Sequence, residues 1–103
     1  MGRELAKKKN DWILYAYIIT RAGGSTSLEE IKSQLTNWKK RNANTRRISQ
    51  VMAMHKKKGF EKIEEKRISS KGQEKFVSIW SFNGDLPQIH RRTLRDWEEK
   101  LSP

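Results

Sequence analysis

Cysteine is absent from this chain of 103 residues, and histidine occurs only twice, as His55 and His90. Without thiols the chain forms neither disulfides nor thiolate metal sites, and the redox compartment stays undefined. The two histidines do not match a metal-ligand spacing such as His-x-x-x-His. We therefore expect no metal centre, and the sequence indicates no cofactor and no small-molecule ligand.

Long apolar stretches are also missing. The longest run, residues 12–19, has eight residues, whereas a transmembrane helix needs about 20. The first ten residues lack the apolar core of a signal peptide. These absences predict an intracellular protein without a membrane segment.

Catalytic patterns are equally scarce. The acidic pairs Glu64–Glu65 and Glu98–Glu99 are neighbours along the chain, whereas paired catalysts must converge across a pocket. The glycines at positions 23 and 24 are not followed by the Gly-Lys-Ser/Thr of a phosphate-binding loop. The sequence therefore predicts a protein that is not an enzyme.

Positive charge, in contrast, is abundant, with a formal net charge of +11. Residues 39–75 hold thirteen basic and four acidic side chains, whereas residues 76–103 are neutral overall. Residues 1–10 form a basic arm that either crosses a phosphate backbone or is simply solvated. A positive field concentrated in one segment favours a polyanionic partner.

Residues 44–59, within the basic segment, have the pattern of an amphipathic helix. Asn44 is a suitable N-cap, and Gly59 suits the left-handed residue that ends a helix. His55 belongs to the apolar side, so we expect it to be packed and hydrogen-bonded; Met54 is assigned to neither side. The apolar stripe, at positions i, i+3, i+4 and i+7, consists of Ile48, Val51, Met52 and His55.

Helices are also expected at residues 11–22 and 27–40. The run 12–19 is apolar nearly all round, which fits a helix covered on several sides or a buried strand; the helical signals that continue to Ala22 favour the helix. Ser27 and Glu30 form a capping box for the second helix. Residues 24–26 can supply a small strand against a later hairpin.

Residues 60–68 and 75–82 are rich in β-branched and aromatic residues and flank a turn at 69–73, which predicts a β-hairpin. A last helix is expected from Asp85, which can cap it together with Gln88, and Pro87 is tolerated in its first turn. It either packs on the first helix or pairs with a second copy. Its apolar stripe consists of His90, Leu94, Trp97 and Leu101.

This order of elements resembles the winged helix-turn-helix family of DNA-binding domains over residues 11–84. Three motifs carry the resemblance: Ser27-Leu-Glu-Glu-Ile31, Ile48-x-x-Val-Met-x-x-His-x-x-x-Gly59-Phe60, and Val77-Ser-Ile-Trp-Ser-Phe82. The family implies an α+β fold with a three-helix core and a two-stranded β wing. Here an extra C-terminal helix, residues 85–103, would follow.

The resemblance implies that helix 44–59 enters the major groove and that the wing touches the backbone or the minor groove. The residues expected to face bases are Arg46, Ser49, Gln50 and Ala53. Those expected near phosphates are Thr45, Arg47 and Lys57 on the helix, and Lys66, Arg67, Lys71 and Lys75 on the wing. The junction 37–44 departs from the family because it is longer and more basic than a tight turn. Either the second helix extends into it, or it contacts phosphate through Lys39, Lys40 and Arg41.

We therefore expect a transcription regulator that binds double-stranded DNA, located in the cytoplasm or nucleoid, or in the nucleus of a eukaryote. A homodimer through the last helix is part of this expectation. Three alternatives remain open: a nucleoid or chromatin protein that coats DNA with little sequence preference, a winged-helix adaptor that binds an acidic protein, and an RNA-binding protein.

Overall fold

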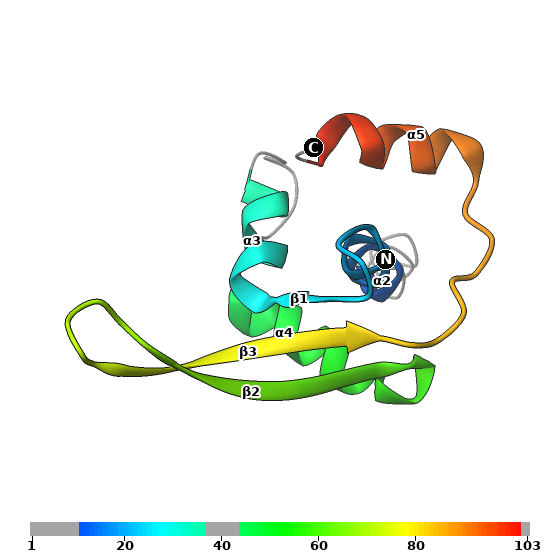
Figure 1. The fold of residues 1–103 in the computed structure, drawn as a ribbon. Coiled ribbons are helices and arrows are strands. Elements are labelled where there is room, and N and C mark those ends of the chain that lie inside the picture. The colour runs from blue at the N-terminus through cyan, green and yellow to red at the C-terminus, as the bar shows by residue number, and fades with distance from the viewer. Residues whose placement is uncertain (1–10, 37–43, 102–103) are drawn as a thin grey trace.

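The chain folds into helices packed against a small antiparallel sheet (Figure 1). The computed structural model describes residues 11–36 and 44–101. In chain order the elements are helix α2 (Asp11–Arg21), strand β1 (Ser25–Ser27), helix α3 (Leu28–Thr36), helix α4 (Thr45–Met54), the 3-10 turn η1 (Lys56–Lys58), strands β2 (Phe60–Ile68) and β3 (Glu74–Phe82), and helix α5 (Arg91–Lys100). This order confirms the expected α+β class. The arm 1–10 and most of the basic junction, with Trp38, Lys39, Lys40 and Arg41, lie outside the described residues.

The sheet has the strand order β1-β3-β2, and both pairings are antiparallel. Thr26 of β1 lies opposite Trp80 of β3, which confirms the small strand expected before the second helix. β2 and β3 pair without a bulge, beginning with Phe60 opposite Phe82. Residues 60–82 form a hairpin that we call the wing, and Figure 1 shows it projecting well past α3.

Helix α2 passes through the centre of the core. Leu14, Ala16 and Ile19 are at most 1% exposed, so the helix is covered on several sides, as its apolar sequence predicts. The Oγ of Ser27 accepts from the amide of Glu30 (3.1 Å), which confirms the expected cap of α3. The other elements bury Ile31 and Leu35 of α3, Ile48 and Met52 of α4, and Phe60, Trp80 and Phe82 of the sheet.

Helix α4 begins where the sequence predicts and ends early. The Oδ1 of Asn44 accepts from the amide of Arg46 (2.8 Å), as expected of an N-cap. The predicted single helix to residue 59 is wrong, because α4 stops at Met54 and residues 56–58 form η1. The amide of His55 donates to the carbonyl of Met52 (3.1 Å), and this three-residue spacing tightens the chain into a 3-10 turn.

Two glycines allow the end of η1 to touch the segment that follows β3. Gly59 has φ +125°, a conformation that side chains rarely adopt. A Cβ on Gly59 would lie 2.6 Å from the Cα of Gly84. The two backbones therefore meet at the base of the wing at a distance that only glycine permits.

Helix α5 begins six residues later than predicted, at Arg91 instead of Asp85. The expected cap by Asp85 is wrong; the Nδ1 of His90 accepts from the amide of Arg92 (3.2 Å) and caps the helix instead. Leu86 precedes Pro87, and a residue before proline disfavours helical backbone. Residues 85–90 consequently run as an irregular segment.

The apolar side of α5 packs on α2, which is one of the two arrangements expected from the sequence. Trp97 is 5% exposed, and its ring centroid lies 5.5 Å from that of Tyr17. The hydroxyl of Tyr17 donates to Glu98 Oε1 (3.2 Å). Burial and the neighbouring Glu98 carboxylate both raise the pKa of Tyr17 above its ordinary value. Helix α5 is thus part of the core of this domain.

Candidate nucleic-acid interface

One side of α4 carries polar and basic side chains into solvent. Arg46, Gln50 and Ala53 are exposed and recur at helical spacing, and Lys57 of η1 continues the row. The opposite side is held in the core by Ile48 and Met52, both 0% exposed. The predicted base-facing residues thus share one accessible surface, at whose margin Thr45 and Ser49 are half-buried. No acidic residue occurs between positions 44 and 59.

Met54 adds an apolar group to the same end of α4, with 79% of its surface exposed. The sequence did not assign this residue, because it lies between the two faces of the helix. Met52, which belongs to the apolar stripe and lies two positions earlier, is fully buried. The packing of α4 thus confirms that Met52 belongs to the buried stripe and places the unassigned Met54 in solvent.

Arg47 differs from Arg46 in its contacts. Its Nη2 lies 3.1 Å from Asp11 Oδ2, and this ion pair joins α4 to the first residue of α2. The Arg47 side chain is 33% exposed and that of Asp11 only 10%. The guanidinium expected near phosphate therefore already stabilises the joint between the two helices.

One lysine of η1, Lys58, lies over a small aromatic cluster. The ring of Trp12 stacks on His55 at 5.6 Å with an interplanar angle of 21°, and Lys58 Nζ lies 5.5 Å from the Trp12 ring centroid. His55 Nδ1 lies 2.8 Å from the carbonyl oxygen of Val51. The expectation of a packed, hydrogen-bonded His55 is confirmed. Lys56 and Lys57 are exposed.

The basic residues of the wing do not form one surface. The pairing places Lys66 opposite Phe76 and Arg67 opposite Lys75, so Lys66 lies on one face of the ribbon and the other two lie on the opposite face. Lys66 Nζ forms an ion pair with Glu74 Oε1 (2.7 Å). Arg67 Nη2 lies 3.5 Å from Glu65 Oε2. Lys71 lies in the turn and is exposed.

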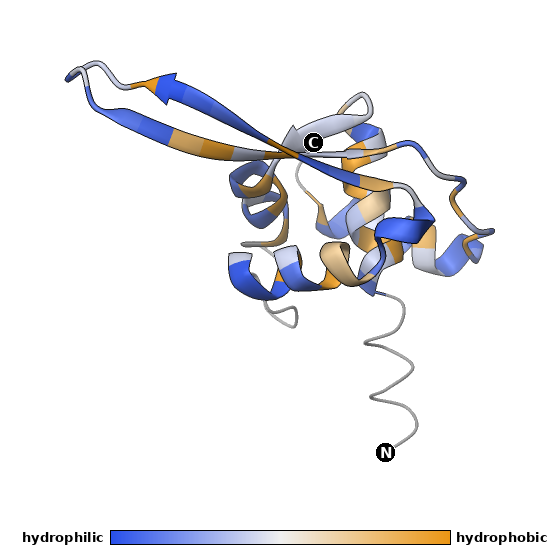
Figure 2. Cartoon of the chain, turned by 90° about the horizontal axis from the view of Figure 1, so that it is seen from below, coloured by the Kyte–Doolittle hydropathy of each residue, from blue (hydrophilic) through white to orange (hydrophobic). Residues whose placement is uncertain are grey.

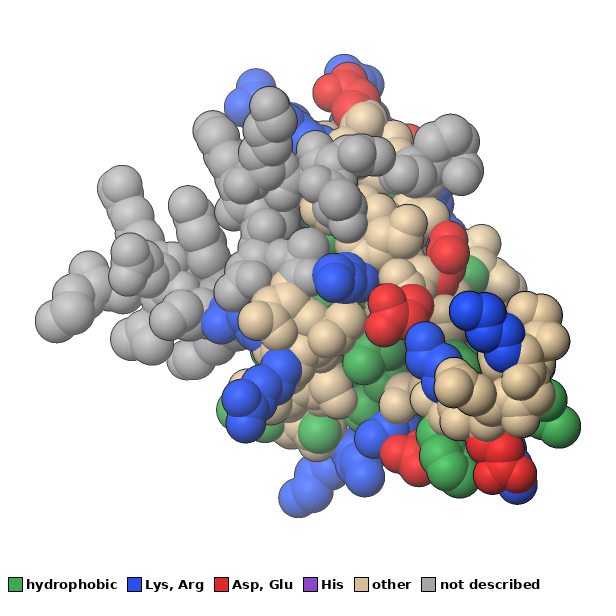
Figure 3. Space-filling model, turned by 90° about the vertical axis from the view of Figure 1, so that its left-hand side faces the viewer, with side chains coloured by type: hydrophobic (Ala, Val, Ile, Leu, Met, Phe, Trp, Pro, Cys, Tyr) green, Lys and Arg blue, Asp and Glu red, His purple; other side chains and the backbone are tan. Residues whose placement is uncertain are grey.

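The wing is nearly neutral. Residues 60–82 contain five basic and four acidic side chains, whereas residues 44–59 contain five basic and none acidic. The sequence expectation treated residues 39–75 as one basic stretch. The structure divides the described part of that stretch into a strongly basic α4–η1 surface and a wing whose charges largely offset one another. Figure 3, which looks along the wing from its tip, shows acidic side chains beside the Lys and Arg side chains.

The wing also exposes large apolar side chains that sequence reasoning missed. Ile63, Ile68 and Phe76 are 58%, 72% and 65% exposed. Figure 2 shows hydrophobic segments on the projecting part of the hairpin. Alternation in the sequence predicts strands, but it does not reveal where a strand leaves the core.

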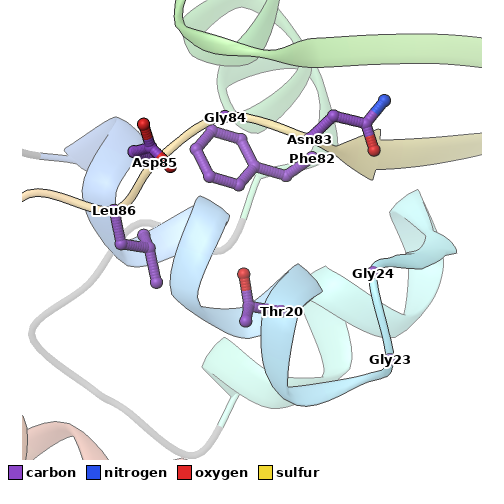
Figure 4. Close-up of a pocket in the computed structure, with 8 residues that line it drawn as sticks. All are labelled: Thr20, Gly23, Gly24, Phe82, Asn83, Gly84, Asp85 and Leu86. Atoms are coloured by element: carbon purple, nitrogen blue, oxygen red, sulfur yellow. The ribbon is translucent and has the colours of Figure 1, made fainter.

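An open depression of about 570 Å³ lies between the end of α2 and the segment after β3 (Figure 4). Asp85 supplies the one carboxylate among its lining residues, which are Thr20, Gly23, Gly24, Phe82, Asn83, Gly84, Asp85 and Leu86. This lining holds neither a nucleophile–base pair nor a set of metal ligands. Across residues 11–36 and 44–101, no three His, Asp or Glu side chains are grouped to hold a metal ion. None of the helices in these ranges combines the length and apolar character that crossing a bilayer requires.

The surface of α4 and η1 is therefore the best-defined candidate site, with Arg46, Gln50, Ala53 and Lys57 as its accessible members. Comparison with models of known families, with curated proteins and with solved structures gives no match to this chain.

Proposed function

We propose that this chain is a winged helix-turn-helix protein that binds double-stranded DNA and regulates transcription. The observation that carries the proposal is the exposed side of α4, where Arg46, Gln50, Ala53 and Lys57 form a row without an acidic neighbour along residues 44–59. Helix α4 would lie in the major groove, and the basic residues on either side would meet phosphates.

The side chains of this row match the chemistry of base edges. Arginine pairs bidentately with guanine and glutamine with adenine, and each good pair discriminates by about 1–3 kcal/mol. Ala53 allows close approach of the helix backbone. Thr45 and Ser49, at the margin of the row, have hydroxyls suited to phosphate or base contacts.

The phosphate contacts are proposed mainly for α4 and η1. Lys56 and Lys57 are exposed there, and Lys39, Lys40 and Arg41 extend the basic sequence on the N-terminal side of α4. The wing would contribute through Lys71 and through Lys66. Lys66 would then exchange part of its ion pair with Glu74 for a phosphate. Each neutralised phosphate makes the slope of log affinity against log salt more negative by about 0.9.

The test is the double variant Arg46→Ala with Gln50→Ala, titrated against duplexes selected from a random pool at fixed salt. We expect an affinity loss of about 30-fold or more, because two base contacts are removed. The matched control is Arg91→Ala with Gln88→Ala, which removes the same chemical groups from exposed positions at the other end of the chain. If the first variant binds as tightly as the parent, α4 is not the reading element.

The same titration separates regulation from general DNA coating. A sequence-reading protein binds selected duplexes more tightly than random ones at the same salt concentration. Equal affinity for both sets would favour the nucleoid or chromatin role.

An adaptor role is the second candidate, and the wing favours it. Exposed Ile63, Ile68 and Phe76 on a nearly neutral hairpin suit a protein partner better than a phosphate backbone. If the α4 double variant keeps its function in cells and substitution of Ile63, Ile68 and Phe76 abolishes that function, the adaptor role is selected.

A further inference from the structure

Met54 is the most exposed of the large apolar side chains that the structure describes, with 79% of its surface in solvent. It is the last residue of α4 and follows Arg46 and Gln50 at a spacing of four. Residues four apart are neighbours on a helix surface, so the three exposed side chains lie in one row. Met54 therefore shares the outer side of α4 with the two residues best suited to base contacts.

The surroundings of Met54 are polar and basic. Lys56 and Lys57 follow it and are exposed, and residues 44–59 include no acidic group. A single exposed apolar side chain indicates no ligand by itself. Here the side chain stands in line with an arginine and a glutamine on a surface of positive charge, so its ligand combines an anionic backbone with an apolar group.

The major groove of DNA displays such an apolar group on its base edges, the C5-methyl of thymine. The other groups on those edges are hydrogen-bond donors and acceptors, for which a thioether is a poor partner. Methionine is unbranched and polarizable, so its Sδ and Cε adapt to the position of a methyl group. In a row whose arginine matches guanine and whose glutamine matches adenine, Met54 matches thymine.

We propose that Met54 is a specificity-determining residue that packs on the C5-methyl of a thymine in the major groove. This inference rests on the proposed DNA binding and adds a base preference that Arg46 and Gln50 do not supply. Four residues advance a helix by about 6 Å, so the thymine lies beyond the base that Gln50 contacts, toward the η1 end of α4.

Ala53, next to Met54, also exposes a methyl group. Its side chain ends at Cβ, so it reaches a thymine only where the helix backbone lies close to the base edge. The Met54 side chain extends further by Cγ, Sδ and Cε. The two residues are separated by the test.

The test replaces single thymines by deoxyuridine in a duplex selected by the parent protein, at fixed salt. Deoxyuridine keeps the pairing with adenine and the O4 acceptor, and it lacks only the C5-methyl. We expect one of these replacements to weaken binding of the parent by about 3- to 5-fold, the effect of one buried methyl group. Met54→Ala weakens binding to the thymine duplex by a similar factor and removes the difference between thymine and deoxyuridine.

Two variants serve as controls. Met54→Leu restores an apolar side chain, so it keeps the preference for thymine. Ile68→Ala truncates a similarly exposed side chain, 72% in solvent, on the wing, and it also keeps that preference. Circular dichroism confirms that each variant is folded, as expected for substitutions at exposed positions.

A parent that binds every deoxyuridine duplex as tightly as the thymine duplex would overturn the inference. A Met54→Ala variant that keeps the full preference for thymine would also overturn it, because another residue, such as Ala53, would then contact the methyl. Either result, together with an affinity loss for the Arg46 and Gln50 variant, leaves the DNA-binding proposal in place. A parent that binds no DNA overturns both.

Discussion

Arg46 and Arg47 are neighbours of identical chemistry with different surroundings. Successive helix positions are turned by about 100°, so one guanidinium enters solvent and the other reaches Asp11 on α2. A sequence pattern assigns both to the same basic cluster. The structure separates an arginine available to a ligand from an arginine that holds two helices together.

This difference predicts unequal effects on stability. Arg47→Ala is expected to lower the free energy of unfolding by about 1.5–3 kcal/mol, because it removes a charge-assisted hydrogen bond to a mostly buried carboxylate. Arg46→Ala is expected to stay within about 0.5 kcal/mol of the parent, as surface substitutions usually do. Urea denaturation followed by circular dichroism measures both values. Equal losses for the two variants would contradict the assignment of Arg47 to the α2–α4 joint.

Residues whose roles depend on near neighbours were predictable from the sequence. Asn44 and Ser27 cap the helices that follow them, because the amides they meet lie two and three positions ahead. Gly59 ends η1 in the conformation that its type favours. The Asp11–Arg47 pair joins residues 36 positions apart, and no local pattern encodes such a contact.

Elements were predicted well and their ends less well. The apolar periodicity of α4 indicates which side is buried, since burial is what the periodicity records. The predicted start of α5 was wrong, because the backbone restriction before Pro87 outweighed the favourable cap at Asp85. The predicted end of α4 was wrong, because a 3-10 turn and an α-helix have nearly the same sequence preferences over three lysines.

The wing combines a buried base with an exposed outer part. Phe82 is 6% exposed and Phe76 is 65% exposed, although both belong to β3 and to the same face of it. Phe82→Ser is expected to lower the free energy of unfolding by about 3–5 kcal/mol, as loss of a buried aromatic side chain does. Phe76→Ser is expected to change it by less than about 0.5 kcal/mol. Thermal or urea unfolding compares the two.

A large loss of unfolding free energy for Phe76→Ser would mean that the outer wing is packed against another part of the molecule. A small loss for Phe82→Ser would mean that the base of the wing does not belong to the core.

At the scale of the whole molecule, α5 completes the core. Trp97 and Leu101 are 5% and 4% exposed, and Tyr17 of α2 contacts Trp97 and Glu98. Trp97→Ala is expected to lower the free energy of unfolding by about 3–5 kcal/mol, a large share of the 5–15 kcal/mol typical of a domain. Glu99→Ala, on the exposed side of the same helix, is the control and is expected to have little effect.

Unfolding curves monitored by circular dichroism measure both α5 variants. A Trp97→Ala protein as stable as the parent would contradict the role of Trp97 in the core. The sequence left this point open, because an amphipathic helix at the end of a chain fits packing and association equally well.

The contact between Gly59 and Gly84 sets how closely the end of η1 approaches the segment that follows β3. Because a Cβ at position 59 would lie 2.6 Å from the Cα of Gly84, any other residue there would push the end of η1 away from the segment that follows β3. The spacing between the base of the wing and the end of η1 is therefore set at Gly59 and Gly84. Lengthening the 69–73 turn would make the wing longer and leave this spacing unchanged. A side chain at position 59 would change the spacing itself.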